Sequence, residues 1–136
     1  MTYAVSAALQ AAVYQLLFTD PEVWDLIEGA VYDALPSGTL PQTYVVLGPE
    51  VVRDRSDKTG NGADHDFTVS VVTEAAGFAG AKAVAGAVAD ALVDADIPLT
   101  RGRLVSMNFS RAVAARVGTG DQRRIDLTFR ARVEDN

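Results

Sequence analysis

Three consecutive residues, Asp64, His65 and Asp66, form the densest group of side chains in the sequence that could do chemistry. Carboxylates beside an imidazole bind divalent metals in proteins or transfer protons. His65 is the only histidine of the 136 residues. A small metal-dependent hydrolase centred on His65, with Asp64, Asp66 or Ser70 as the further group, is therefore the enzymatic alternative.

The geometry of a β-strand argues against that site. Alternate positions from Phe67 to Val71 are apolar, which predicts a strand with one buried face. Successive side chains of a strand point to opposite faces, so His65 is expected to point with Phe67 while Asp64 and Asp66 point the other way. We expect His65 to be a strand-end residue half covered by the preceding loop, with no metal and no cofactor.

Two further catalytic patterns are weaker still. Ser56 and Ser70 could pair with His65, but neither lies in the strand–turn–helix motif that exposes a nucleophilic serine. The stretch "DKTGNG" lacks the GxxxxGK[ST] order of a phosphate-binding loop, and no predicted helix follows it. This stretch is expected to be a flexible loop tip.

Charge is distributed unevenly along the chain. Residues 101–136 contain eight arginines and four acidic residues, whereas residues 1–100 contain four basic and fourteen acidic residues. The net charge of −6 disfavours binding to a phosphate backbone, and no aromatic residues interleave with Arg124, Arg130 and Arg132 to stack on bases. The two regions are either solvated strand faces or complementary surfaces that meet between copies of the protein.

Two helices are predicted before any strand. The first spans residues 4–17, because its apolar residues fall at the spacing of one helical stripe: Val5, Ala8, Leu9, Ala12, Val13, Leu16 and Leu17. The second begins at the capping sequence "TDPE" and ends at Gly29. Its predicted buried side consists of Val23, Trp24 and Ile27.

Strands and one further helix follow. We predict short strands at "AVYDA" and "TYVVLG", an exposed, mobile segment from Arg53 to Asn61, and a strand from Phe67. An Ala-rich helix then presents a stripe made of Phe78, Ala81, Ala85, Val88 and Leu92.

The last third of the sequence predicts a long β-hairpin. Its first strand is expected to place Val105, Met107, Phe109 and Val113 on one face, and its turn is "GTGD". Its second strand alternates polar residues with apolar ones, which are Ile125, Leu127, Phe129, Ala131 and Val133.

These elements define an α+β fold in which two N-terminal helices and one Ala-rich helix pack on one face of a mixed, mostly antiparallel sheet that ends in the hairpin. The length predicts one domain, residues 1–136. The chain has no cysteine, so disulfides and thiolate metal sites are excluded. The first helix lacks the cationic start of a signal peptide, and no apolar run is long enough to span a membrane.

The order of these segments resembles the tail-terminator (tail completion) family of long-tailed phages and gene transfer agents. The resemblance extends over nearly the whole chain and is carried by seven segments: "LQAAVYQLL", "DPEVWDLIEGAVYDALP", "TYVVLG", "DKTGNGADHDFTVSVVT", "AKAVAGAVADAL", "LVSMNFSRAV" and "IDLTFRARV". None of them is a catalytic signature.

The resemblance implies a structural protein, not an enzyme, that needs no cofactor. Such a protein is made in the bacterial cytoplasm and forms a ring, usually of six copies, at the head–tail junction of a virion or phage-like particle. The ring caps the head-proximal end of the tail tube, ends its growth and joins the tail to the head connector or stopper protein. DNA passes through its lumen without specific binding, and no membrane is involved. Another connector ring, a stopper or an adaptor, is the nearest alternative.

The resemblance also places the protein contacts in two segments, the charged loop from Arg53 to Asp64 and the "GTGD" end of the hairpin. The predicted interface residues are Arg53, Asp54, Arg55, Asp57, Lys58, Asp64, Arg116, Asp121, Arg123 and Arg124.

Overall fold

Three helices and five strands make up the part of the chain that the computed structural model describes, residues 3–58, 60–118 and 120–135. In chain order they are α1 (Ser6–Thr19), α2 (Pro21–Ile27), β1 (Val31–Tyr32), β2 (Thr43–Asp54), β3 (Asn61–Thr73), α3 (Ala79–Leu92), β4 (Arg103–Arg116) and β5 (Arg123–Asp135).

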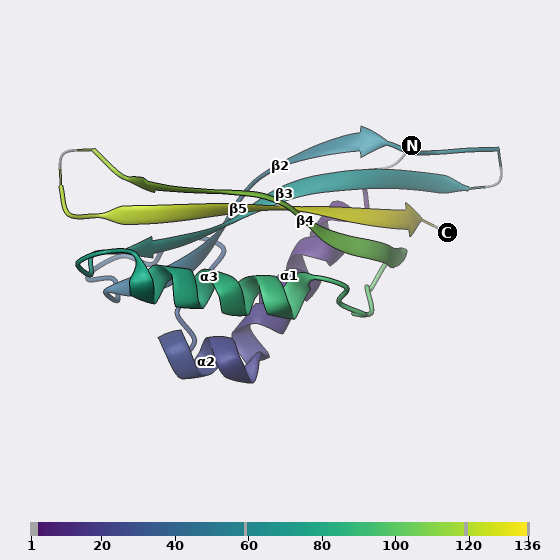
Figure 1. The fold of residues 1–136 in the computed structure, drawn as a ribbon. Helices are drawn as coiled ribbons and strands as arrows, with labels where there is room; N and C mark the ends of the chain where they lie inside the picture. Colours follow the sequence, from purple (N-terminus) through teal and green to yellow (C-terminus); the bar gives the residue numbers. More distant parts are fainter. Residues whose placement is uncertain (1–2, 59, 119, 136) are drawn as a thin grey trace.

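The five strands form one sheet in the order β1-β2-β3-β5-β4. The β1–β2 pair is parallel and the other three pairs are antiparallel. All three helices lie on the same face of this sheet, and the β2–β3 and β4–β5 hairpins point to opposite ends of it (Figure 1). The predicted α+β fold, with helices on one face of a mostly antiparallel sheet, is confirmed.

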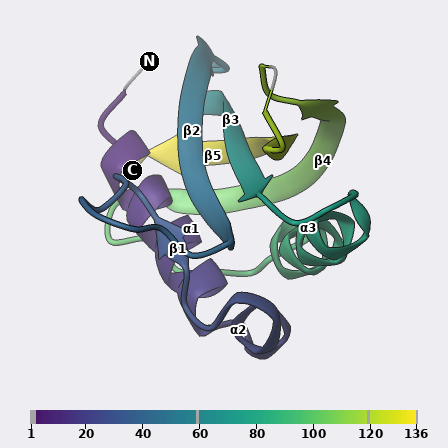
Figure 2. The same cartoon turned by 90° about the vertical axis from the view of Figure 1, so that its left-hand side faces the viewer.

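Helices α1 and α3 pack through the stripes that the sequence predicts. Their buried apolar residues include Val5, Leu9, Val13 and Leu17 at α1, and Ala81, Val84, Ala85, Val88 and Leu92 in α3. In the end view, α1 lies beneath the β1 side of the sheet and α3 beneath the β4 side (Figure 2). The many alanines of α3 leave little side-chain bulk between the helix and the strands.

Helix α2 begins as its sequence predicts. The carboxylate of Asp20 accepts a hydrogen bond from the amide of Val23 at 3.0 Å, and Pro21 occupies the first turn. The left-handed conformation that ends the helix starts at Glu28, with φ of 51°, and continues at Gly29.

The predicted burial of Trp24 is wrong. Its side chain is 45% exposed, whereas Val23 and Ile27 are buried. The indole lies over Gly29, where an added Cβ would come within 2.6 Å of the ring, and it meets Phe18 edge to face. Trp24 therefore packs along the outside of the two helices and leaves part of its ring in solvent.

The charged segment between β2 and β3 is shorter than predicted. Strand β2 continues past Gly48, through a register shift between Leu47 and Glu50, and ends at Asp54. Strand β3 begins at Asn61 instead of near Phe67. Arg53, Asp64 and Asp66 occur in these strands because their side chains lie on the sheet face that no helix covers, where they form ion pairs.

Strand β4 also departs from simple alternation. Register shifts occur between Leu104 and Ser106 and between Phe109 and Arg111. Met107 is buried as predicted, but Val113 pairs with Asp126 on the face without helices and is 43% exposed. Each bulge reverses the side-chain alternation of the residues beyond it.

The core lies between the helices and the sheet. Apolar residues of β5, from Ile125 to Val133, form its floor as predicted, and Phe129 stacks on Phe67 with ring centroids 5.8 Å apart. None of the helices in the described ranges combines the length and the apolar character that a membrane crossing requires.

Candidate interaction surfaces

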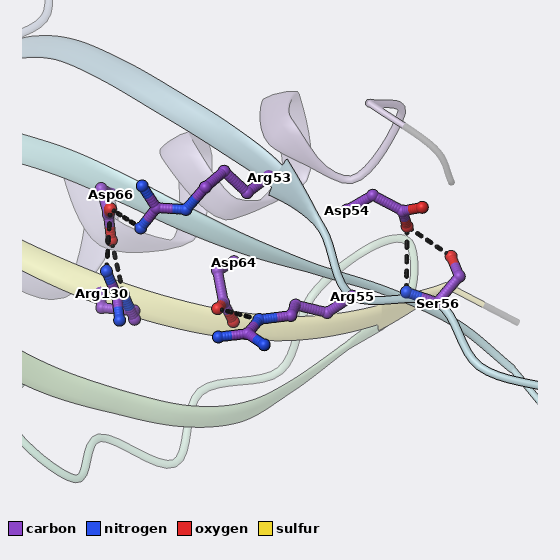
Figure 3. A network of polar contacts seen from close by, with 7 residues as sticks. All are labelled: Arg53, Asp54, Arg55, Ser56, Asp64, Asp66 and Arg130. Carbon is purple, nitrogen blue, oxygen red and sulfur yellow. Dashed lines mark hydrogen bonds and ion pairs between the residues drawn. The ribbon is translucent and has the colours of Figure 1, made fainter.

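A network of ion pairs covers the polar face of the sheet near the β2–β3 hairpin. The carboxylate of Asp66 in β3 receives Arg53 from β2, with Nη2 to Oδ2 at 2.6 Å, and Arg130 from β5, with Nε to Oδ1 at 2.8 Å (Figure 3). A hydrogen bond from Arg130 is the largest cause that holds the pKa of Asp66 below its ordinary value of 3.8. The network joins three strands.

The residues nearest the hairpin tip are held by their own side chains. Arg55 donates to Asp64 at 2.7 Å, and Asp64 is only 3% exposed. The carboxylate of Asp54 accepts from the hydroxyl of Ser56 at 2.6 Å and from its amide at 2.9 Å (Figure 3). These bonds, the side-chain bond first, lower the pKa of Asp54. These bonds hold Arg55 and Ser56, the residues that follow β2, against the strands.

The predicted contact residues at this end differ in what they can offer a partner. Arg53 and Arg55 leave more than half of their side chains exposed, and Asp57 and Lys58 lie on the exposed loop. Asp64 is buried in the monomer and holds Arg55. Asp64 therefore orients Arg55 and exposes almost none of its own side chain to a partner.

A second group surrounds the β4–β5 end. Arg124 donates to Asp126 at 2.7 Å and to the hydroxyl of Ser70 at 3.1 Å. Arg123 donates to the carbonyl of Ala75 at 3.2 Å and lies over the ring of Phe78, with 5.6 Å from its Cζ to the ring centroid. Burial raises the pKa of Asp126, but the hydrogen bonds from Ser70 and Arg124 and the charge of Arg124 outweigh it, so this pKa is lowered.

The predicted residues thus form two groups, at opposite ends of the sheet (Figure 1). Arg116 and Asp121 are exposed beside the β4–β5 turn. Thr119, inside the predicted "GTGD" contact, lies outside the described residues. A molecule with charged groups at both ends of one rigid sheet can contact two different neighbours.

His65 lies on the core side of β3, away from Asp64 and Asp66. The predicted separation of faces is therefore correct, but the side chain is fully buried and not half covered by a loop. Its Nδ1 is 3.4 Å from the carboxylate of Glu50, and no partner of Nε2 is found within the described chain. No group of three His, Cys, Asp or Glu residues in the described ranges could hold a metal ion.

Glu50 connects this histidine to the first helix, an arrangement that the sequence did not suggest. Its Oε1 accepts from the hydroxyls of Tyr3 and Ser6, both at 2.5 Å. Burial raises the pKa of Glu50, but hydrogen bonds from Ser6, Tyr3 and His65, together with the charge interaction with His65, outweigh it and lower the pKa. The cluster has the geometry of a structural link between α1, β2 and β3.

Comparison with known proteins identifies the family. Residues 11–134 match the family model described as tail completion protein gp17. The chain belongs to this family. Among solved structures, a chain of the "Virion of native gene transfer agent (GTA) particle" is 64% identical, with a TM-score of 0.94, and the match covers 98% of this chain and 99% of that one. None of the curated protein sequences compared with the chain matches it.

Membership of the tail completion family confirms the resemblance and the expectation of a structural, non-enzymatic role at a tail or head–tail joint. It agrees with the separation of His65 from the two aspartates. The sequence signals of the family are spread over many segments. The strongest local pattern, "ADHDF", is structural instead: His65 is buried in the core, and Asp64 and Asp66 form ion pairs on the polar face.

Proposed function

We propose that the chain forms a ring, expected to contain six copies, that caps the head-proximal end of the tail tube. The ring ends tube growth and joins the tail to the connector or stopper protein of the head. The observation that carries this proposal is the match to the tail completion family across residues 11–134. The similarity to a chain of a gene transfer agent virion supports a place at the head–tail junction of such a particle.

The two charged ends of the sheet support a joining role. The β2–β3 hairpin carries Arg53 and Arg55, and the opposite end carries Arg116 and Arg123. Arginine suits protein interfaces because its planar guanidinium donates several hydrogen bonds at once. One end would contact the tube protein and the other the connector.

A ring at this place must let DNA pass through its lumen. The chain has a net charge of −6, and a surface of the same sign as the phosphate backbone disfavours adhesion of the duplex. Passage without specific binding is therefore consistent with the composition.

Deletion of the gene tests the proposal. Electron microscopy of particles made without the protein should show tails of irregular length that do not join heads. Tails of normal, uniform length joined to heads would contradict it. Separate pull-downs with the tube protein and with the portal-side proteins distinguish a terminator, which binds both, from a stopper or adaptor, which does not bind the tube.

A further inference from the structure

Strand β4 leaves one side of the sheet open. It is the last strand of the sheet, and nothing in the described chain pairs with its outer edge. All nine residues from Asn108 to Arg116 are exposed, and five of these are apolar: Phe109, Ala112, Val113, Ala114 and Ala115. Long apolar edge strands promote association and are usually protected by lysine or proline, and β4 contains neither.

A groove runs between this strand and helix α3. We call it the β4–α3 groove. Its walls are Ala85, Gly86 and Ala89 from α3 and Phe109, Ala112 and Ala114 from β4, with Ile125 and Leu127 at its floor and Lys82 at its rim. Phe109 is 47% exposed although it touches Phe129 edge to face. Phe109, Ala112 and Ala114 thus extend the groove to the open edge of β4, whereas Val113 and Ala115 lie on the sheet face without helices.

The charge of β4 is entirely positive. The strand contains three arginines and no acidic residue. Arg103 pairs with Glu134, but the side chains of Arg111 and Arg116 make no hydrogen bond or ion pair with any described residue. An acidic partner would therefore complement the edge.

The same chain carries such a surface on α2. No lysine or arginine precedes Arg53, and Glu22, Asp25 and Glu28 are exposed. Two large apolar side chains, Trp24 and Leu26, are each 45% exposed among them. We call these five residues the acidic α2 surface. Exposed aromatic and aliphatic side chains surrounded by charge are typical anchors of protein interfaces.

The two surfaces lie at different places on the subunit. In the end view α2 is beneath the helical layer, whereas the open edge of β4 is on the far side of α3 (Figure 2). Contact between two different patches repeats from copy to copy and closes into a ring when the rotation allows it. A symmetric dimer would instead use one patch twice.

We infer that the β4–α3 groove and the adjoining β4 edge bind the acidic α2 surface of a second copy of this chain. The inference rests on the proposed function, because it names the surfaces through which the ring closes. Arg116 and Lys82, on the helix side of the sheet, face the carboxylates of the neighbour, and Trp24 or Leu26 enters the apolar groove.

Two glycines of α3 provide a matched test of the groove. Gly86 lines it and Gly80 does not, and an added Cβ would meet no atom within 4 Å at either position. Gly86→Glu should place a carboxylate in the groove without a clash in the monomer. Burial of an unpaired charge against an acidic neighbour should lower incorporation into particles at least about tenfold. Gly80→Glu should be incorporated normally, and equal incorporation of the two variants would overturn the inference.

Cysteine cross-linking tests the pairing itself, because the chain contains no cysteine. A Leu26→Cys/Ala112→Cys variant, with Ala112 in the wall of the groove, assembled into particles and treated with a short bismaleimide, should give a ladder of linked copies. Either single variant alone should give none, and the two mixed should give only dimers. Absence of the ladder, or dimers from one single variant, would overturn the inference.

The two proposals fail in different ways. If uniform tails joined to heads require the protein, but the cysteine variant gives no ladder, the proposed surfaces are rejected and the terminator role stands. The reverse outcome is also distinct. If the cysteine variant gives the ladder, but particles made without the gene have tails of normal length joined to heads, the terminator role is rejected and the interface stands.

Discussion

Asp66 is the residue on which the polar face of the sheet depends most. Its two oxygens accept three hydrogen bonds, one from Arg53 and two from Arg130. The side chain is 18% exposed, so solvent replaces only part of these interactions if they are lost. Both arginines reach it from neighbouring strands, which ties β2 and β5 to β3 through side chains as well as backbone.

We expect Asp66→Asn to lower the free energy of unfolding by roughly 1–2 kcal/mol, because the amide cannot accept charge-assisted bonds from both arginines. Urea denaturation measures the change. Asp90→Asn, on the exposed surface of α3, is the matched control and should shift stability by less than about 0.5 kcal/mol. Equal effects of the two substitutions would show that the network contributes nothing.

His65 tests whether any chemistry remains in the core. Leucine has a similar volume and no polar atom, so His65→Leu should remove the unpartnered Nε2 and lose only the long 3.4 Å contact of Nδ1 with Glu50, and stability should change by less than about 1 kcal/mol. Tail length and head joining should be unchanged in electron micrographs, because the side chain of His65 is fully buried and offers no surface to a partner. A folded variant, shown by circular dichroism, that no longer supports assembly would reveal a function for the imidazole.

At the scale of elements, the turn that leads into β4 depends on one glycine. Gly102 has φ of 70°, and an added Cβ would lie 2.5 Å from the carbonyl oxygen of Glu134 and 3.1 Å from the side chain of Val5. The backbone of β5 cannot move away without disturbing its pairing with β3. Both the conformation and the close approach therefore require glycine.

We expect Gly102→Ala to destabilise the protein by roughly 3 kcal/mol, from left-handed strain together with the backbone clash. Gly38→Ala is the control, since Gly38 has φ of 91° but no atom within 4 Å of an added Cβ, and it should cost about 1 kcal/mol. Thermal unfolding followed by circular dichroism distinguishes them. Similar losses of stability in both variants would show that left-handed backbone strain acts alone and that the clash with Glu134 contributes nothing.

At the scale of the whole molecule, acid should weaken the fold. Glu50, Asp66 and Asp126 have lowered pKa values in the native state, whereas the unfolded chain titrates near 4.5 for Glu and 3.8 for Asp. A lowered native pKa contributes stability that is complete above the unfolded value and is lost as pH falls through the lower native value. The free energy of unfolding should therefore fall from about pH 4.5 downward.

Denaturant titrations at a series of pH values measure this dependence. A double variant, Asp66→Asn with Asp126→Asn, should show a shallower decline in acid because two of the carboxylates with a lowered native pKa are gone. A wild-type curve that is flat down to pH 3 would mean that these carboxylates bind protons equally in both states.

Local sequence patterns predict the three helices, the alternation of β5 and the hairpin that ends the chain. These follow from local periodicity and capping, such as Asp20 before Pro21, which need no distant partner. The same patterns also separate His65 from Asp64, because alternation along a strand is local. The order of segments was enough to indicate the family.

Tertiary contacts set how far β2 and β3 extend, where the side chains of β4 change face and why Trp24 stays exposed. Asp66 is acceptable in a strand because Arg130, 64 residues away, neutralises it, and the bulge near Phe109 depends on pairing with β5. The open edge of β4 likewise exists only as a consequence of strand order. Contacts between segments far apart in the chain set these features, and local sequence patterns carry no record of such contacts.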